Sequence, residues 1–187
     1  LSLRAGEAAL AVYAGEDALV HFRAATELAV TPAEEFAALS GMGDANVSLG
    51  RHNEAIEHFA QALAFAPDSD AEAELHRRTG RAHERQGDYD RALDAYGAAH
   101  EALAGAMSMT GLRTADGLAT VYVRLGRHGV AAGLCLDALA WLAANPGAQG
   151  SRRAEAWIRN TLGMAYLHDG EHDAAIEKLE RSLGGIK

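Results

Sequence analysis

The sequence contains one cysteine and three prolines, and aromatic residues make up 6% of its 187 positions. A single cysteine cannot form an internal disulfide, which is typical of proteins from a reducing cytoplasm. No apolar run approaches the roughly 18 residues that mark a membrane-spanning helix, and no signal-peptide pattern opens the chain. We therefore expect a cytoplasmic protein without a membrane span.

Acidic residues outnumber basic residues. The chain has 26 aspartates and glutamates and 17 lysines and arginines, which gives a formal net charge of -9. General nucleic-acid binding relies on basic side chains that neutralise phosphates, so this balance argues against direct nucleic-acid binding. Hydrophobic residues make up 49% of the chain, and alanine dominates them. That share suffices for a continuous core, and the abundance of alanine, arginine and leucine favours helix over strand.

One spacing pattern recurs along the chain. A small residue is followed seven positions later by a glycine, then by a small or large apolar residue after five, four and three further positions. Such self-similarity at a period of about 20 to 50 residues indicates stacked structural units. The four copies are Gly43, Gly50, Ala55, Phe59 and Ala62; Gly80, Gly87, Ala92, Tyr96 and Ala99; Ala119, Gly126, Ala131, Cys135 and Ala138; and Gly163, Gly170, Ala175, Leu179 and Ser182.

These residue types suit antiparallel helix pairs. The first small residue lets a neighbouring helix approach closely, and the glycine seven positions later can take the left-handed conformation that ends the first helix. The large residue of each copy fills the space between adjacent units, because one helix pair cannot bury its apolar face alone. Cys135 occupies that position, so we interpret it as a core thiol rather than a nucleophile.

The pattern resembles the tetratricopeptide repeat, a helix-turn-helix unit with small residues at the helix crossings and large apolar residues between them. The resemblance covers residues 36–187 in four units, and Ala18, Leu19, Phe22 and Ala25 imitate the second helix of a degenerate first unit. The turn glycines are 37, 39 and 44 residues apart, against about 34 in the usual repeat. Longer units of this kind occur in kinesin light chains and in the sensor ends of actinobacterial signal-transducing regulators.

The resemblance implies an all-α, right-handed α-solenoid of about five antiparallel helix pairs, or ten helices. We expect a single solenoid domain over residues 1–187, with units at about 1–30, 33–67, 70–105, 106–144 and 150–187. Because Leu1 is not a methionine, we expect a piece of a larger protein. The last predicted helix carries apolar residues with no polar capping helix after it, which predicts further repeats or self-association through the C-terminal end.

In tetratricopeptide stacks, the first helices of the units line a concave groove. On the central first helix, Leu75 and Ala82 share the packing face, and a row of arginines lies on another face. If the repeats stack in the usual way, arginines of two units form a basic stripe that could bind an acidic peptide or a chain terminus. The arginines of this predicted stripe are Arg77, Arg81, Arg85, Arg113 and Arg124.

The alternative is an ordinary solvated face with local ion pairs, because Glu74 and Glu84 lie among these arginines and Glu74 is four residues before Arg78. A second candidate surface lies on the last predicted first helix, opposite its packing residues. There, apolar side chains would either form the hydrophobic end of the groove or be covered by neighbouring helices. The residues of this second surface are Trp157, Asn160, Met164 and His168.

Catalytic and metal-binding signals are weak. His168 and His172 are four residues apart, but Gly170 places a turn between them and spoils the geometry of a zinc site on one helix. We therefore expect a non-catalytic scaffold that binds a protein or peptide, without a cofactor or metal. The runner-up is an effector-sensing regulatory module of a larger transcriptional or nucleotide-hydrolysing regulator.

Overall fold

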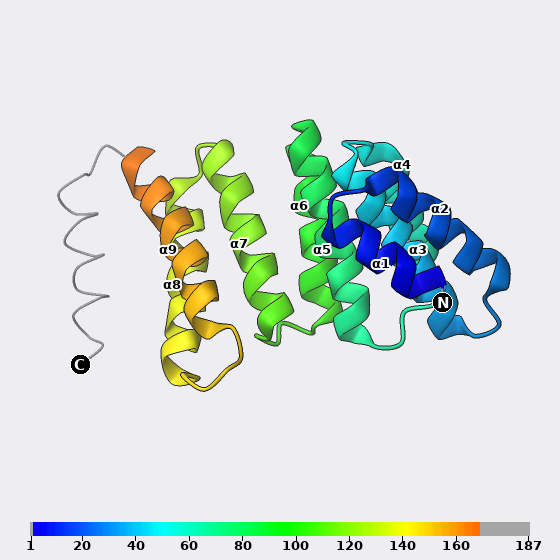
Figure 1. The fold of residues 1–187 in the computed structure, drawn as a ribbon. Helices are drawn as coiled ribbons and strands as arrows, with labels where there is room; N and C mark the ends of the chain where they lie inside the picture. The colour runs from blue at the N-terminus through cyan, green and yellow to red at the C-terminus, as the bar shows by residue number, and fades with distance from the viewer. Residues whose placement is uncertain (1, 169–187) are drawn as a thin grey trace. The chain divides into compact units, whose positions relative to one another are not determined.

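The chain folds into helices only, within the part that the structure describes. A computed structural model describes residues 2–168, where nine α-helices and no strands form (Figure 1). This confirms the predicted all-α fold, and the predicted tenth helix, 172–183, lies outside the described residues. The helices are α1 (Ser2–Ala11), α2 (Gly15–Leu28), α3 (Pro32–Ser48), α4 (His52–Leu63), α5 (Ser69–Gln86), α6 (Tyr89–Ala102), α7 (Met109–Arg124), α8 (His128–Ala144) and α9 (Ser151–His168).

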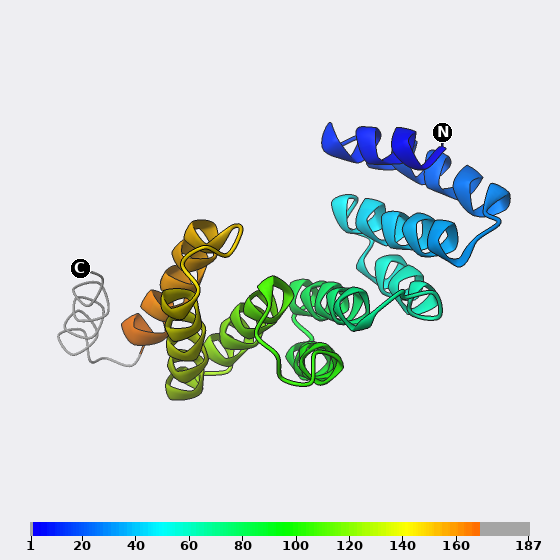
Figure 2. The same ribbon diagram turned by 90° about the horizontal axis from the view of Figure 1, so that it is seen from below.

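The chain divides into two compact units, residues 1–104 and 105–187. In the first unit, α1 to α6 form three consecutive helix pairs, and each pair packs against the next (Figure 2). In the second unit, α7 packs against α8, and α9 packs against both. A buried cluster that includes Leu112, Cys135 and Ile158 joins these three helices.

The ends of the helices follow the predicted signals. Gly50, Gly87 and Gly126 each follow a first helix with positive φ angles of 73°, 77° and 73°, a conformation that glycine adopts at no steric cost. Thr31 begins α3 with a capping box, in which its side chain accepts from the backbone N–H of Glu34 and the Glu34 carboxylate accepts from the backbone N–H of Thr31.

The structure also reveals that the first helix pair, α1 and α2, follows the whole repeat pattern. Gly6, Tyr13, Ala18, Phe22 and Ala25 keep the same spacing as the other copies. Tyr13 stands where the others have the turn glycine, and its φ angle of 60° is left-handed as well. The sequence pattern concealed this copy because tyrosine rarely occupies that conformation.

Each large residue of the repeat packs against the small residue of its own pair. A Cβ added to Gly43 would overlap with the Phe59 ring, and one added to Gly80 would lie 2.9 Å from Cδ1 of Tyr96. We expected these rings to fill the space between units, and the structure adds a contact within the pair. Phe59 serves both purposes, because it also clusters with Leu75 of the next pair. The expected partner of Gly163 lies outside the described residues.

Replacing Gly43 with alanine should destabilise the protein by about 1 to 3 kcal/mol, because the added methyl group would displace the buried Phe59 ring. Gly97→Ala is the matched control, since Gly97 lies within α6 with nothing near an added Cβ. That change should stabilise the protein by up to about 1 kcal/mol through helix propensity. Urea unfolding of both variants tests the two signs, and equal effects would contradict this packing.

Candidate functional site

Helix α5 carries the main candidate site, and its sequence explains how the site is presented. The Asp68 side chain caps the helix by accepting a 2.8 Å hydrogen bond from the backbone N–H of Ala71. Leu75 and Ala82 are each 1% exposed on its packing face. Because arginines recur every three to four positions beside that face, they project together along one side of the helix.

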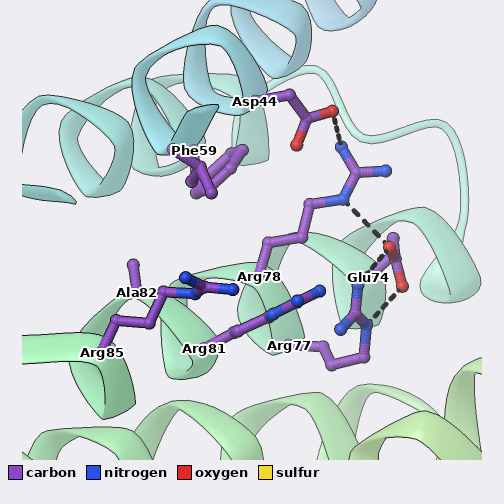
Figure 3. Close-up of a pocket in the computed structure, with 9 residues that line it drawn as sticks. Asp44, Phe59, Glu74, Arg77, Arg78, Arg81, Ala82 and Arg85 are labelled. Atoms are coloured by element: carbon purple, nitrogen blue, oxygen red, sulfur yellow. Dashed lines mark hydrogen bonds and ion pairs between the residues drawn. The ribbon is translucent and has the colours of Figure 1, made fainter. Parts of the chain in front are cut away.

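A pocket of about 240 Å³ lies between α3, α4 and α5 (Figure 3). We call it the α3–α5 pocket. Its apolar wall comes from all three helices, and its polar wall consists of four arginines and two carboxylates, which leaves a formal excess of two positive charges. The lining residues are Asp44, Val47, Phe59, Glu74, Arg77, Arg78, Arg81, Ala82 and Arg85.

Two of the four arginines are held by carboxylates. Nε and Nη2 of Arg77 each donate a 2.7 Å hydrogen bond to the Glu74 carboxylate, and Nε of Arg78 donates to the same group at 2.9 Å. Nη1 of Arg78 reaches across to α3, where it donates to Oδ2 of Asp44 at 2.8 Å and to Oγ of Ser40 at 3.0 Å. Arg78 therefore ties two successive helix pairs together (Figure 3).

The network shifts the acidity of its two carboxyls in opposite directions. Burial by itself would raise the pKa of Glu74, but the hydrogen bonds and charges of Arg77 and Arg78 outweigh it and lower that pKa to about 2. Partial burial raises the pKa of Asp44, with a smaller contribution from Glu74, although Arg78 opposes the shift. Glu74 is therefore the stronger anchor of the arginines at neutral pH.

The other two arginines of the pocket are not compensated. Arg81 and Arg85 are exposed, and neither forms a hydrogen bond or ion pair with any residue of the described range. Their side chains lie on the side of α5 that faces Phe59 (Figure 3). Glu84, which the sequence placed among the arginines, instead accepts a 3.1 Å hydrogen bond from the hydroxyl of Tyr96.

The structure divides the arginines of the predicted stripe between two helices, α5 and α7. The α3–α5 pocket brings Arg77, Arg81 and Arg85 together, while Arg113 and Arg124 are exposed on α7 in the second unit. A continuous stripe through both units stays a prediction. The ion pair of Glu74 with Arg78 was expected as part of the alternative interpretation, and it forms. The bridge from Arg78 to Asp44 was not predicted from the sequence, because Asp44 lies about one repeat earlier in the chain.

The second candidate surface, on α9, is partly packed. Ile158, Leu162 and Tyr166 are buried, as the predicted packing face requires. Trp157 is half-buried against the core of the second unit, so neighbouring residues cover part of it. Asn160 is exposed, Met164 is half-buried, and the side chain of His168 lies outside what the structure describes.

The described residues offer little for metal or nucleophilic chemistry. Within residues 2–168, no group of three or more His, Cys, Asp or Glu residues could hold a metal ion. In the same range, no helix is long and apolar enough to cross a membrane. The Cys135 thiol is 1% exposed, and burial together with the charge of Asp116 raises its pKa to about 12. These properties are those of the core thiol that the sequence predicts.

Cys135 should therefore react with a thiol-specific disulfide reagent at pH 8 about 1000-fold more slowly in the folded protein than in urea, because both thiolate fraction and access are reduced. Absorbance of the released chromophore measures both rates. Comparable rates in the two conditions would contradict a core position.

Glu74→Gln should destabilise the protein at pH 7 by on the order of 2 kcal/mol, because two arginines lose their carboxylate partner. The folded pKa of Glu74 is lowered, so its contribution is present above the ordinary pKa of 4.5 and is lost as the pH falls toward about 2. The difference between native and variant proteins should therefore shrink over that window. Urea unfolding at several pH values measures it.

Glu57→Gln is the control for this experiment, since Glu57 is exposed on α4 and lines no part of the pocket. It should leave stability nearly unchanged at each pH. A Glu74→Gln difference that stays constant from pH 7 to pH 3 would contradict the role of the Glu74 charge.

Comparisons with known proteins agree with this architecture. Among solved structures, similar folds include a Podosopora anserina putative kinesin light chain with nearly identical TPR-like repeats (TM-score 0.76, 17% identity, 98% of this chain and 92% of that one). Another is MamA (TM-score 0.67, 20% identity, 98% and 88%), and a third is BtubC (BKLC) from P. vanneervenii (TM-score 0.69, 19% identity, 97% and 74%).

At these identities the structural likeness shows the fold alone. No curated protein matches the sequence significantly. The sequence model of the tetratricopeptide repeat matches residues 34–104 and 111–185, which is well over half of the chain. The protein therefore belongs to the tetratricopeptide repeat family.

Proposed function

We propose that this protein is a non-catalytic scaffold that binds an acidic segment of a partner protein in the α3–α5 pocket. The observation that carries the proposal is the pair of uncompensated arginines, Arg81 and Arg85, in a pocket whose other arginines are already paired. A scaffold role is typical of tetratricopeptide repeats, which bind other proteins or peptides.

The physical basis is charge-assisted hydrogen bonding. A guanidinium group presents a planar fork that matches a carboxylate, and such bonds are stronger than those between neutral groups. The apolar wall formed by Val47, Phe59 and Ala82 excludes water from one side of the pocket, which strengthens the attraction between charges. A partner carboxylate would therefore bind here more strongly than at an open surface.

The second unit carries two further arginines of the predicted stripe. Arg113 and Arg124 are exposed on α7, where we propose that they bind carboxylates of a partner. On α9, Asn160 and the exposed parts of Trp157 and Met164 would contact apolar or polar residues of the partner, and we assign His168 to this surface from its position on the helix.

The Arg81→Glu/Arg124→Glu double variant tests this proposal by co-purification from a lysate of the source cells. A partner retained by the native protein should be lost by the variant, because charge reversal repels acidic groups in both units. Mass spectrometry identifies the retained species, and circular dichroism checks that the variant stays helical.

Arg23→Glu/Arg152→Glu is the matched control, with one exposed arginine reversed in each unit outside the α3–α5 pocket. It should retain the partner. If both double variants hold the same species as the native protein, the pocket is not the binding surface.

A further inference from the structure

The α3–α5 pocket carries more information than a general preference for acidic partners. Arg77, Arg81 and Arg85 follow one another at intervals of four residues on α5. Like charges at that spacing destabilise a helix. Glu74 neutralises Arg77, whereas Arg81 and Arg85 have no carboxylate partner in the described range. The repulsion between Arg81 and Arg85 destabilises the helix, and no carboxylate of that range offsets it. Such a violation of a local stability rule is expected at a functional site.

The size of the pocket limits what can neutralise this pair. At about 240 Å³ the pocket has room for side chains rather than for a folded segment. One glutamate or aspartate brings a single charge and two oxygens, enough for one guanidinium fork. To neutralise both arginines, carboxylates would have to come from two residues, which are about 7 Å apart when they share one face of an extended peptide.

A phosphorylated side chain meets both requirements. It carries a charge of about -1.5 to -2 at pH 7 and three acceptor oxygens on one small group. Those oxygens can accept from two guanidinium groups at once, and the charge matches the formal excess of two in the pocket. Side chains four apart on a helix are neighbours, so the ends of Arg81 and Arg85 can converge on one tetrahedral group.

The remaining lining residues fit this assignment. Asp44 and Glu74 would repel a phosphoryl group, but each is bound to an arginine within the pocket. Arg78 and Arg77 are thereby held in place on the far side of the pocket from Arg85. Val47 and Phe59 form the apolar wall that would contact the carbon stem of the modified side chain.

Resting on the proposed function, we infer that Arg81 and Arg85 form a site for the phosphoryl group of a partner peptide phosphorylated on serine or threonine. The scaffold would then hold its partner only after modification. Arg81 and Arg85 would distinguish a phosphorylated partner from an acidic one, because a phosphorylated side chain carries about two negative charges and a glutamate or aspartate carries one.

The test uses the full 187-residue chain and three fluorescent peptide pools that share uncharged random flanks and differ at the central residue, which is phosphoserine, glutamate or serine. Fluorescence polarisation should show that the phosphoserine pool binds at least about tenfold more tightly than the glutamate pool. Arg81→Gln/Arg85→Gln should abolish that preference, and Arg23→Gln/Arg91→Gln, which removes two exposed arginines elsewhere in the first unit, should keep it.

Inorganic phosphate provides a second readout. At constant ionic strength it should raise the melting temperature of the native protein and of Arg23→Gln/Arg91→Gln, and not that of Arg81→Gln/Arg85→Gln, because a ligand stabilises the state that binds it. Without phosphate, Arg81→Gln/Arg85→Gln should melt no lower than the native protein, since it removes a like-charge pair. This comparison separates lost binding from lost folding.

Three results would overturn the inference. Equal binding of the glutamate and phosphoserine pools would assign a carboxylate site, and no binding above the serine pool would remove the site altogether. A phosphate-dependent melting shift without peptide binding would assign the free ion. In the first case the proposed scaffold function stands, because a partner captured through Arg81 and Arg124 does not need to be phosphorylated.

Discussion

The fold depends on one contact that repeats along the first unit, an aromatic ring from a second helix seated on a glycine of the first. Phe22 packs on Gly6 and Gly41, Phe59 on Gly43, and Tyr96 on Gly80. A fully buried ring of this kind stabilises a fold by roughly 1.5 to 3 kcal/mol relative to an exposed one. Because the glycine has no side chain, the two helices approach closely enough for the ring to contact both. Phe22 also shows that one ring can join successive pairs, because it contacts a glycine of its own pair and a glycine of the next.

That contact also explains how much of the structure the sequence could predict. Its members are spaced at fixed intervals, so the helix pairs, their turn glycines and the buried face of α5 were all predictable from period and residue size. The first copy was recognised only in its second helix, because Tyr13 replaces the glycine. The packing of Phe59 on Gly43 of its own pair was also not predicted. Spacing shows which residues recur, but it does not show whether a ring contacts Gly41 or Gly43, which lie two positions apart on α3.

The site was predicted less completely than the fold. Helical geometry placed Arg77, Arg81 and Arg85 on one face, and the pocket contains all three. The same geometry could not say which of them is compensated, because that depends on rotamers and on side chains from another helix. The Glu74 pairing was visible at short range, but Asp44 and Ser40 reach Arg78 from more than thirty positions away. Because of those contacts, Arg77 and Arg78 are paired with carboxylates of the described residues, whereas Arg81 and Arg85 are not.

The bridge from Arg78 to α3 has a consequence for the dimensions of the site. Its guanidinium donates to Glu74 on its own helix and to Asp44 on the helix of the preceding pair. Arg78 therefore links α3 and α5 at this level, in addition to the buried cluster that includes Leu39, Phe59 and Leu75. A wall held in this way does not need to close around a group that enters. In the proposed site, the cost of ordering side chains would therefore fall on Arg81 and Arg85, which no carboxylate of the described residues holds in place.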